Sequence, residues 1–496
     1  MTTAVNAPTP AERASALLAD GRSLIGGDRV PGTAETRTHV DPATGTALAE
    51  IALAGPGEIE AAVAAARAAF PGWRRTAPGA RRDTLRRIAD ALEAHTDELA
   101  ALVTLEIGQP FRAARAGVGG AVEWFRYYAG WADKLEGIVA PVAPGSVLDY
   151  TIPEPYGVVA AIIPWNGPVI SLALKVAPAL AAGNCVVLKP SELAPFSSLR
   201  AGALALEAGL PPGVLNVVPG AAAAGDALCR HPQVGKISFT GGGATARAVV
   251  TAAAEEHTPV VLELGGKSAS LVFADADVAS VGKLAAILGL AQNSGQGCFL
   301  PTRLLVERSV YDAVIERVVA TAQGIRLGDP FDPGTSMGPV VSEEASARIV
   351  GTVERAVREG AGRLCTGGRR AGGDLARGFF VEPTVVADAD PTAPLAREEI
   401  FGPVLAVLPF DGEEEAVALA NGTRYGLAGY VWTNDLRRAH RVAGALEAGY
   451  VSVNGMAPLP PAAPFGGWNA SGHGQEGGRA GIEEFLRTKN VHVSLR

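Results

Sequence analysis

Cysteine is scarce in this chain of 496 residues, and the four that occur lie far apart: Cys185, Cys229, Cys298 and Cys365. No two of them show a CxxC or metal-ligand spacing, so we expect no metal site. Four cysteines in so long a chain do not form a disulfide framework either. We therefore expect a reducing compartment, the cytoplasm.

Long hydrophobic runs and dense blocks of one charge are also absent. The most apolar stretch, 172–188, is interrupted by Lys175 and Pro178, whereas a membrane span needs about 20 consecutive apolar residues. The N-terminus has no basic segment followed by an apolar one, so we expect no secretory signal. Lys and Arg number 43 against 51 Asp and Glu, a formal charge of −8. This acidic balance excludes nucleic acid as the main partner, and we expect no membrane partner.

Hydrophobic periodicity predicts an α/β protein. An apolar stripe from Leu85 to Leu102 predicts one long helix that ends at Gly108. From residue 158 onward, short β-rich runs alternate with Ala-rich helical segments, a pattern that builds a parallel sheet with helices on both faces. The predicted strands are 158–163, 185–188, 215–218, 236–239, 260–264, 270–273, 303–306, 381–386, 404–409, 430–432 and 491–495, with an extended excursion over 137–155.

Cys298 is the candidate nucleophile. It follows a run of small and polar residues, 293–297, that contains two glycines. A free cysteine is more often a buried small hydrophobic residue, but a glycine-rich loop exposes the thiol, as a nucleophile requires. The other three cysteines have apolar or helical surroundings and are interpreted as structural.

Two further polar residues follow predicted strands. Glu263, at the end of strand 260–264, is either a general base with a raised pKa or half of an ion pair, with Lys267 as a candidate partner. Asn166 follows strand 158–163, at the edge of the sheet where ligands bind. Its amide could donate to an oxyanion, or it could cap the helix that starts near Pro168.

Candidate nucleotide-binding residues come next. Lys189 and Glu192 follow strand 185–188 at a spacing that can hold the vicinal hydroxyls of a ribose, although Ser191 could equally begin a helix as part of a capping box. The glycine-rich turn 239–243 can bring backbone N–H groups to a pyrophosphate. It lacks the GxGxxG spacing and is weak evidence by itself.

Taken together, these motifs resemble the aldehyde dehydrogenase superfamily of NAD(P)-dependent enzymes. The resemblance extends from about Leu24 to the C-terminus, and the order of seven motifs excludes chance. They are Pro164-Trp165-Asn166, Lys189-Pro190-Ser191-Glu192, Phe239-Thr240-Gly241, Glu263-Leu264-Gly265-Gly266-Lys267, Gly295-Gln296-Gly297-Cys298, Glu398-Glu399-Ile400-Phe401-Gly402-Pro403 and Pro464-Phe465-Gly466-Gly467.

The resemblance implies a catalytic role for four residues. Cys298 is expected to attack the aldehyde and form a thiohemiacetal, while Asn166 and the Cys298 backbone N–H form the oxyanion hole. Hydride transfer to the nicotinamide then leaves a thioester. Glu263 is expected to activate the water that hydrolyses it, and Lys175 to help relay the proton.

It also implies which residues bind the cofactor. Lys189 and Glu192 are expected at the adenosine ribose, Glu399 at the nicotinamide ribose and Phe401 beside the nicotinamide. The other expected cofactor residues are Trp165, Ser191, Gly241, Gly242 and Gly265. Glu192 favours NAD, because an acid repels a 2′-phosphate; NADP remains possible because this glutamate can swing away in the family.

The phosphate turn departs from the family pattern. Gly242 and Gly243 stand where Ser and Thr are usual, and Ala246 replaces a glycine. We therefore expect one hydroxyl contact to the pyrophosphate to be lost.

The resemblance implies a fold in three parts. A Rossmann-like NAD(P)-binding domain comprises 1–136 and 156–262, and an α/β catalytic domain comprises 263–479. A small β bridging element, 137–155 with 480–496, joins subunits in relatives, so a homo-oligomer is expected, with dimer and tetramer both open.

The candidate substrate pocket comprises Gly167, Leu174, Phe299 and Phe465, in and around segments 167–174 and 457–465 that carry no charge. This composition predicts a neutral apolar or aromatic aldehyde, and Gly167 leaves room for a bulky group. The alternative is a cationic amino-aldehyde such as betaine aldehyde, held by aromatic rings. The aromatic residues at helical spacing, Trp124, Tyr127 and Tyr128, could line the entrance or lie in the core.

Two other activities could use the same thiol. A thioester could be passed to coenzyme A, although such relatives generally lack a glutamate at position 263. An esterase would hydrolyse esters without any nucleotide.

Overall fold

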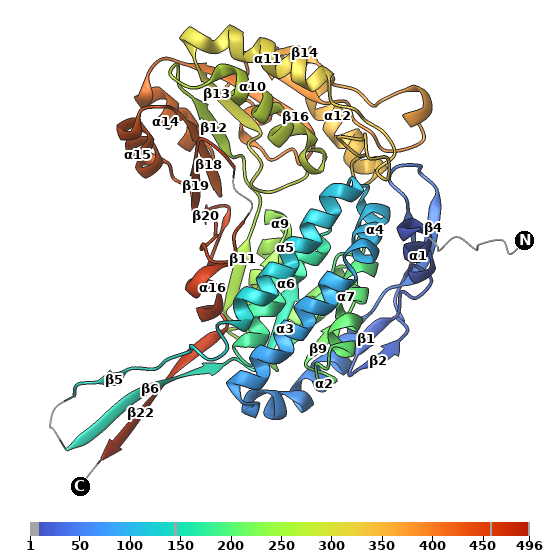
Figure 1. Cartoon of the computed structure of the whole chain (residues 1–496), viewed down its shortest axis with the longest axis vertical. Coiled ribbons are helices and arrows are strands. Elements are labelled where there is room, and N and C mark those ends of the chain that lie inside the picture. Colours follow the sequence, from blue (N-terminus) through green and yellow to red (C-terminus); the bar gives the residue numbers. More distant parts are fainter. Residues whose placement is uncertain (1–8, 143–145, 457–458, 495–496) are drawn as a thin grey trace, which may run out of the picture.

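The computed structural model describes residues 9–142, 146–456 and 459–494. It confirms the α/β class: one sheet with its helices forms the lower body in Figure 1, a second forms the upper body, and a narrow β-arm projects at the lower left. Ala457, in the expected pocket segment, and Leu495, in the expected C-terminal strand, lie outside the described residues.

The first sheet contains a parallel core. Its strand order is β2-β1-β9-β8-β7-β10-β11-β21, and the pairs from β9 to β11 are parallel. Continuous apolar sequence forms these central strands because helices cover both faces of such a sheet. The bounds are β1 Ser23–Ile25, β2 Asp28–Val30, β7 Val158–Ile162, β8 Cys185–Lys189, β9 Leu215–Val217, β10 Val234–Thr240, β11 Val260–Glu263 and β21 Gly472–His473.

The helices around this sheet include one correction to the prediction. The expected single helix through Leu85 and Leu102 is two helices, separated at His95, whose φ of −110° and ψ of 22° are not helical. Both pack on the same core, so the apolar stripe continues across the break. The bounds are α1 Pro10–Leu17, α2 Pro56–Arg75, α3 Pro78–Ala94, α4 Thr96–Ile107, α5 Phe111–Ala129, α6 Pro168–Ala181, α7 Phe196–Glu207, α8 Ala222–Cys229 and α9 Gly243–Glu255.

The second sheet has the order β14-β15-β16-β13-β12-β18-β19 and is parallel except for β14. The strand predicted at 381–386 begins later, at Thr384. The bounds are β12 Ala269–Val272, β13 Arg303–Glu307, β14 Arg363–Thr366, β15 Thr384–Ala387, β16 Val404–Phe410, β18 Ala428–Trp432 and β19 Tyr450–Val453, with helices α10 Val278–Ala286, α11 Tyr311–Gln323, α12 Glu343–Arg358, α13 Pro394–Arg397, α14 Glu413–Asn421 and α15 Leu436–Ala445.

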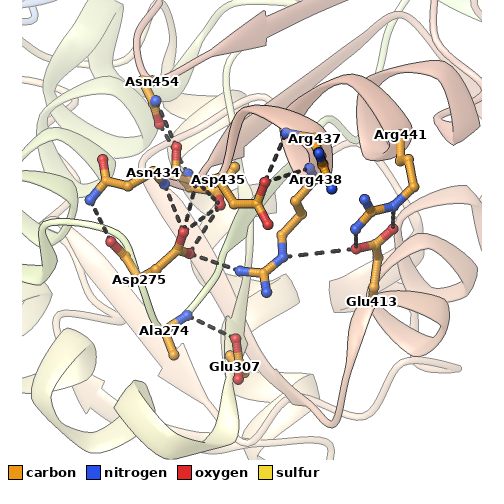
Figure 2. Close-up of polar contacts among 11 residues, drawn as sticks. Ala274, Asp275, Glu307, Glu413, Asn434, Asp435, Arg437, Arg438, Arg441 and Asn454 are labelled. Carbon is orange, nitrogen blue, oxygen red and sulfur yellow. Dashed lines mark hydrogen bonds and ion pairs between the residues drawn. The ribbon is translucent and has the colours of Figure 1, made fainter.

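Asp275 ties two loops of this second sheet together, one after β12 and one after β18 (Figure 2). Its carboxylate accepts the Thr433 hydroxyl at 2.8 Å, the backbone N–H of Asn434 at 2.9 Å and the Arg438 guanidinium at 2.9 Å. Several charge-assisted bonds to one acid fix the start of α15 against the sheet. The bonds around Asp275 therefore have a structural role.

The β-arm comprises β5 Val139–Ala140, β6 Val147–Pro155 and β22 Leu486–Ser494. β22 pairs antiparallel with β6 along its whole length, from Leu486 opposite Pro155 to Ser494 opposite Val147. The excursion and the C-terminal strand of the sequence therefore form one sheet, as expected.

Strand β21 brings the C-terminal segment back to the first sheet. β21 pairs antiparallel with β11, although 472–473 lies inside the segment expected to be catalytic. The remaining short elements are the hairpin β3 Thr36–Val40 and β4 Ala47–Ala52, the pair β17 Tyr425–Gly426 and β20 Trp468–Asn469, and helix α16 Gly478–Glu483. Over the residues that the structure describes, no helix combines the length and apolarity needed to cross a membrane.

Asn184 offers a test of this connection. Its fully buried amide donates to the Phe485 carbonyl at 2.9 Å and accepts the Gly157 N–H at 3.0 Å, so it links the C-terminal segment to the first sheet. We expect Asn184→Ala to lower the free energy of unfolding by about 2 kcal/mol, because buried partners lose their hydrogen bonds. Denaturant unfolding measures this. The exposed Asn434→Ala is the control, and equal losses in both variants would contradict the prediction.

Candidate active site

Two cavities meet at Cys298, and a third adjoins one of them. Cavity A, of about 230 Å³, and cavity B, of about 420 Å³, share walls formed by Asn166, Glu263 and Cys298. Cavity C, of about 540 Å³, adjoins B at Trp165 and Gly241. The thiol can therefore be reached from A on one side and from B on the other.

The loop before Cys298 is held in an unusual backbone conformation. Asn293, Ser294 and Gly295 have φ of 48°, 54° and 70°, in the left-handed region that costs energy for residues other than glycine. The Gln296 side chain accepts the Val341 N–H at 2.9 Å and fastens the loop to the residues just before α12. At Gly295 a Cβ would collide with the Gly402 carbonyl. This strain is maintained by the surrounding structure, as is common at functional sites.

The Cys298 thiol is half-buried and protonated at neutral pH. Burial raises its pKa, and the nearby Glu399 and Glu263 carboxylates raise it further. A thiol attacks as the thiolate, so attack here requires a base or a bound ligand that changes these surroundings.

Asn166 lies beside this loop. Its Nδ2 donates to the Gln296 carbonyl at 3.2 Å, which leaves one N–H of the amide for another acceptor. The alternative that Asn166 caps a helix is wrong: α6 has Gly167 as its N-cap and no side-chain cap.

Glu263 and Lys175 lie with a third residue that the sequence analysis missed, Glu476. Lys175 Nζ is fully buried and donates to Glu476 Oε1 at 2.8 Å and to Ser238 Oγ at 2.9 Å. Burial raises the pKa of Glu263 well above its usual value, Glu476 adds to this, and Lys175 opposes it. Glu263 Oε1 has no hydrogen-bond partner among the described residues. A buried carboxylate with a free oxygen at the wall of a cavity is suited to accept a proton.

The alternative that Glu263 pairs with Lys267 is wrong. Lys267 lies away from it, and its nearby acids are Glu399 and Glu398. Its Nζ is buried without a partner among the described residues, and burial lowers its pKa to about 7.

Cavity B brings together Glu399, Phe401, Trp165 and Gly265. The Glu399 carboxylate lies where a Cβ on Gly265 would stand and accepts the Gly266 N–H at 3.2 Å. Phe401, at a φ of 52°, meets the Trp165 ring edge-on at 5.5 Å. Arg348, which no motif of the sequence indicated, also lines this cavity.

Cavity C contains Lys189, Ser191 and Glu192. Lys189 Nζ donates to the Gly220 carbonyl at 2.5 Å, and the Ser191 hydroxyl accepts the Leu193 N–H at 3.2 Å. The capping-box alternative for this segment is wrong, because α7 begins only at Phe196.

The phosphate turn joins cavities B and C. Gly241 and Gly242 line both, and Gly242 is the N-cap of α9, whose first N–H groups have no intrahelical partner. Ala246 is buried, whereas the Thr245 hydroxyl side chain lines cavity C, a contact that the sequence analysis missed. The Arg424 guanidinium lies 3.5 Å from the position of a Cβ on Gly243.

These residues fit a dinucleotide. An acid lies in each of the two cavities, Glu192 in C and Glu399 in B, and glycine backbone with a helix N-terminus lies between them. Acids accept ribose hydroxyls, and a helix N-terminus favours phosphate.

All four expected pocket residues line cavity A: Gly167, Leu174, Phe299 and Phe465. The aromatic residues Trp124 and Tyr128 are in the core, so they do not form its entrance. Glu476 also lines this cavity; it is 11 residues beyond Phe465 in the chain, and the pairing of Phe465 with Glu476 brings the two side by side. Within 9–142, 146–456 and 459–494, no three His, Cys, Asp or Glu side chains form a group that could hold a metal ion.

The raised pKa of Cys298 predicts slow alkylation at neutral pH. The iodoacetamide rate, corrected with Cys298→Ala, is expected to rise with pH beyond about 8.5, where a free cysteine is half ionised. The reason is that burial and two carboxylates keep the thiol protonated. A rate that reached its plateau below that pH would contradict this.

Known proteins resemble this chain along almost its whole length. Residues 30–491 match the model of the aldehyde dehydrogenase family. The chain is 43% identical to a betaine aldehyde dehydrogenase of Cereibacter sphaeroides over 92% of this chain and 93% of that protein. It is 42% identical to a phenylacetaldehyde dehydrogenase of Pseudomonas fluorescens, covering 95% of each. A betaine aldehyde dehydrogenase of Staphylococcus aureus, solved with NAD+, superposes with a TM-score of 0.94 at 36% identity. The superposition covers 97% of this chain and 96% of that one. The chain belongs to the aldehyde dehydrogenase family.

Proposed function

We propose that the protein oxidises an aldehyde to its carboxylic acid with NAD or NADP, through a covalent intermediate on Cys298. The observation that carries this proposal is the meeting of Cys298, Asn166 and Glu263 where cavities A and B join. An aldehyde in A and a nicotinamide in B would approach the same sulfur from two sides.

In the first step the Cys298 thiol loses its proton to solvent, and its sulfur attacks the aldehyde carbon and makes it tetrahedral, because an aldehyde does not readily release hydride otherwise. The free N–H of Asn166 and the Cys298 backbone N–H would stabilise the oxyanion. Loss of one such donor typically costs about 10²–10³ in rate. The bound cofactor supplies the hydride acceptor.

In the second step Glu263 acts on the thioester that remains on Cys298. Its free oxygen would accept a proton from water as the water attacks. Lys175, held between Glu476 and Ser238, lies behind it and would help pass this proton onward. The charge of Lys175 also lowers the pKa of Glu263 and so favours the ionised base.

Glu263 separates this function from transfer to coenzyme A. Transfer to coenzyme A does not need a base for water, whereas Glu263 lies ready to activate it. Ester hydrolysis would pass through the same thioester and use the same base, so a requirement for NAD distinguishes the dehydrogenase from an esterase.

We infer a preference for NAD. Glu192 and Asp226 both line cavity C, and two acids there would repel a 2′-phosphate.

A neutral apolar or aromatic aldehyde suits cavity A best. Among the described residues its wall is mostly apolar, and its two acids, Glu263 and Glu476, serve the proton path. A carboxylated substrate would therefore find no free cation. A quaternary ammonium aldehyde would need rings around its charge, and the described wall provides only Phe299 and Phe465.

Two further features, the β-arm and the cysteines, bear on the assembly and the location of the protein. We propose a homo-oligomer, because the β-arm exposes Leu148, Ile152 and Val493 and leaves one edge of β22 unpaired within the described chain. All four cysteines are free thiols, which supports a cytoplasmic location.

We assign the domains by their sheets. Segments 1–136 and 156–262 would bind the cofactor, 263–479 would supply the nucleophile, and 137–155 with 480–496 would bridge subunits. β21 is the exception, since it extends the first sheet.

The proposal is tested by the rise in absorbance at 340 nm, with NAD and NADP separately, over benzaldehyde, a medium-chain alkanal, betaine aldehyde and succinate semialdehyde. We expect reduction of NAD by a neutral aldehyde, and its loss in Cys298→Ala. Full activity of that variant would refute the mechanism. Ester hydrolysis without nucleotide, in the absence of NAD reduction, would establish the esterase instead.

Glu263→Gln separates the two steps. If Glu263 serves hydrolysis alone, this variant should give a burst of about one NADH per active site, followed by turnover at least about 100-fold slower than wild type. Stopped-flow absorbance measures both phases. Absence of the burst would show that Glu263 is needed for the thiol attack.

A further inference from the structure

One face of helix α5 forms part of the wall of cavity A. Ala114, Gly117 and Val118 all line it, and their spacing of three and four residues places them on one side of the helix. Gly117 is the member without a side chain. A Cβ built there meets no atom within 4 Å, so the backbone at this point faces open space.

A second glycine in the same wall differs in this respect. Gly167 precedes α6, and a Cβ there would lie 2.9 Å from Ile170 Cγ2. Ile170 also reaches toward α5, where its Cδ1 lies 3.4 Å from the Cβ position of Gly120. Ile170 thus occupies the space beside Gly167, so the expectation that Gly167 leaves room for a bulky group is wrong, and beside Gly120 it lies in contact distance of a Cβ. Beside Gly117 the space is still free.

The rest of the wall favours a ring. Phe299 and Phe465 meet edge to face at 6.1 Å, and both line the cavity together with Leu174 and Leu459. Aromatic rings gain from such edge and offset contacts beyond their buried area. The cavity measures about 230 Å³, whereas an apolar cavity of about 150 Å³ holds benzene.

We propose that Gly117 determines substrate specificity, and that the substrate is an aldehyde carrying a ring, whose far side lies in the free space beside Gly117. This inference rests on the proposed function for the reaction, and it adds the class of substrate and the residue that admits it. A side chain at position 117 would occupy the space of the ring and leave the thiol untouched.

The test compares Gly117→Leu with Gly119→Leu. Gly119 is on the same helix, also has free space at its Cβ, and does not line the cavity, so both changes gain helix propensity alike. For wild type and each variant, the quantity measured is the ratio of kcat/KM for phenylacetaldehyde to kcat/KM for propanal. Wild type should favour phenylacetaldehyde, Gly117→Leu should lower the ratio at least about tenfold, and Gly119→Leu should leave it within about twofold.

Binding gives a readout that does not depend on turnover. Phenylacetone, a ketone that cannot be oxidised to an acid here, should bind the full-length wild type and Gly119→Leu, by calorimetry, and bind Gly117→Leu at least about tenfold more weakly. Binding without oxidation of any aldehyde would support Gly117 and refute the proposed function. Oxidation of propanal with an unchanged ratio in Gly117→Leu, or equal binding by both variants, would overturn the role of Gly117.

Discussion

The active site depends on how closely the chain passes itself at Gly265 and Gly266, between the two sheets. β11 ends at Glu263 and β12 begins at Ala269, so these glycines span the junction. A Cβ at Gly265 would occupy the place of the Glu399 carboxylate, and one at Gly266 would lie 2.7 Å from the Cys298 carbonyl. Only residues without side chains let the acid, the thiol and Glu263 converge.

Charge compensation is the second constraint. Glu263 and Glu476 are both buried beside Lys175, which is itself fully buried. An isolated charge at this depth would cost several kcal/mol, so the single cation makes the pair of acids tolerable. Because Lys175 bonds to Glu476 and to Ser238, Glu263 keeps one oxygen free for chemistry. The arrangement that stabilises the buried charges therefore also leaves a Glu263 oxygen available as the proposed base.

Much of the fold was predictable from particular elements. The apolar runs that became β7, β8 and β10 are long enough and flanked clearly enough to be assigned from sequence. The break at His95 was not, since α3 and α4 continue one apolar stripe and no proline or glycine marks the change. The short strand β21 was missed because two residues carry no periodicity; its pairing with β11 is decided by the whole C-terminal segment.

The amino-acid sequence by itself determined the family, the candidate nucleophile Cys298 and the alternation of strands and helices, because these are written in local motifs and periodicity. Tertiary structure alone decided that Glu476 joins Lys175, that Lys267 lies away from Glu263, and that Gly117 faces free space in cavity A. Lys175 and Glu476 are 301 positions apart, and even for Glu263 and Lys267, four positions apart, burial and distance exist only once the two sheets have packed together.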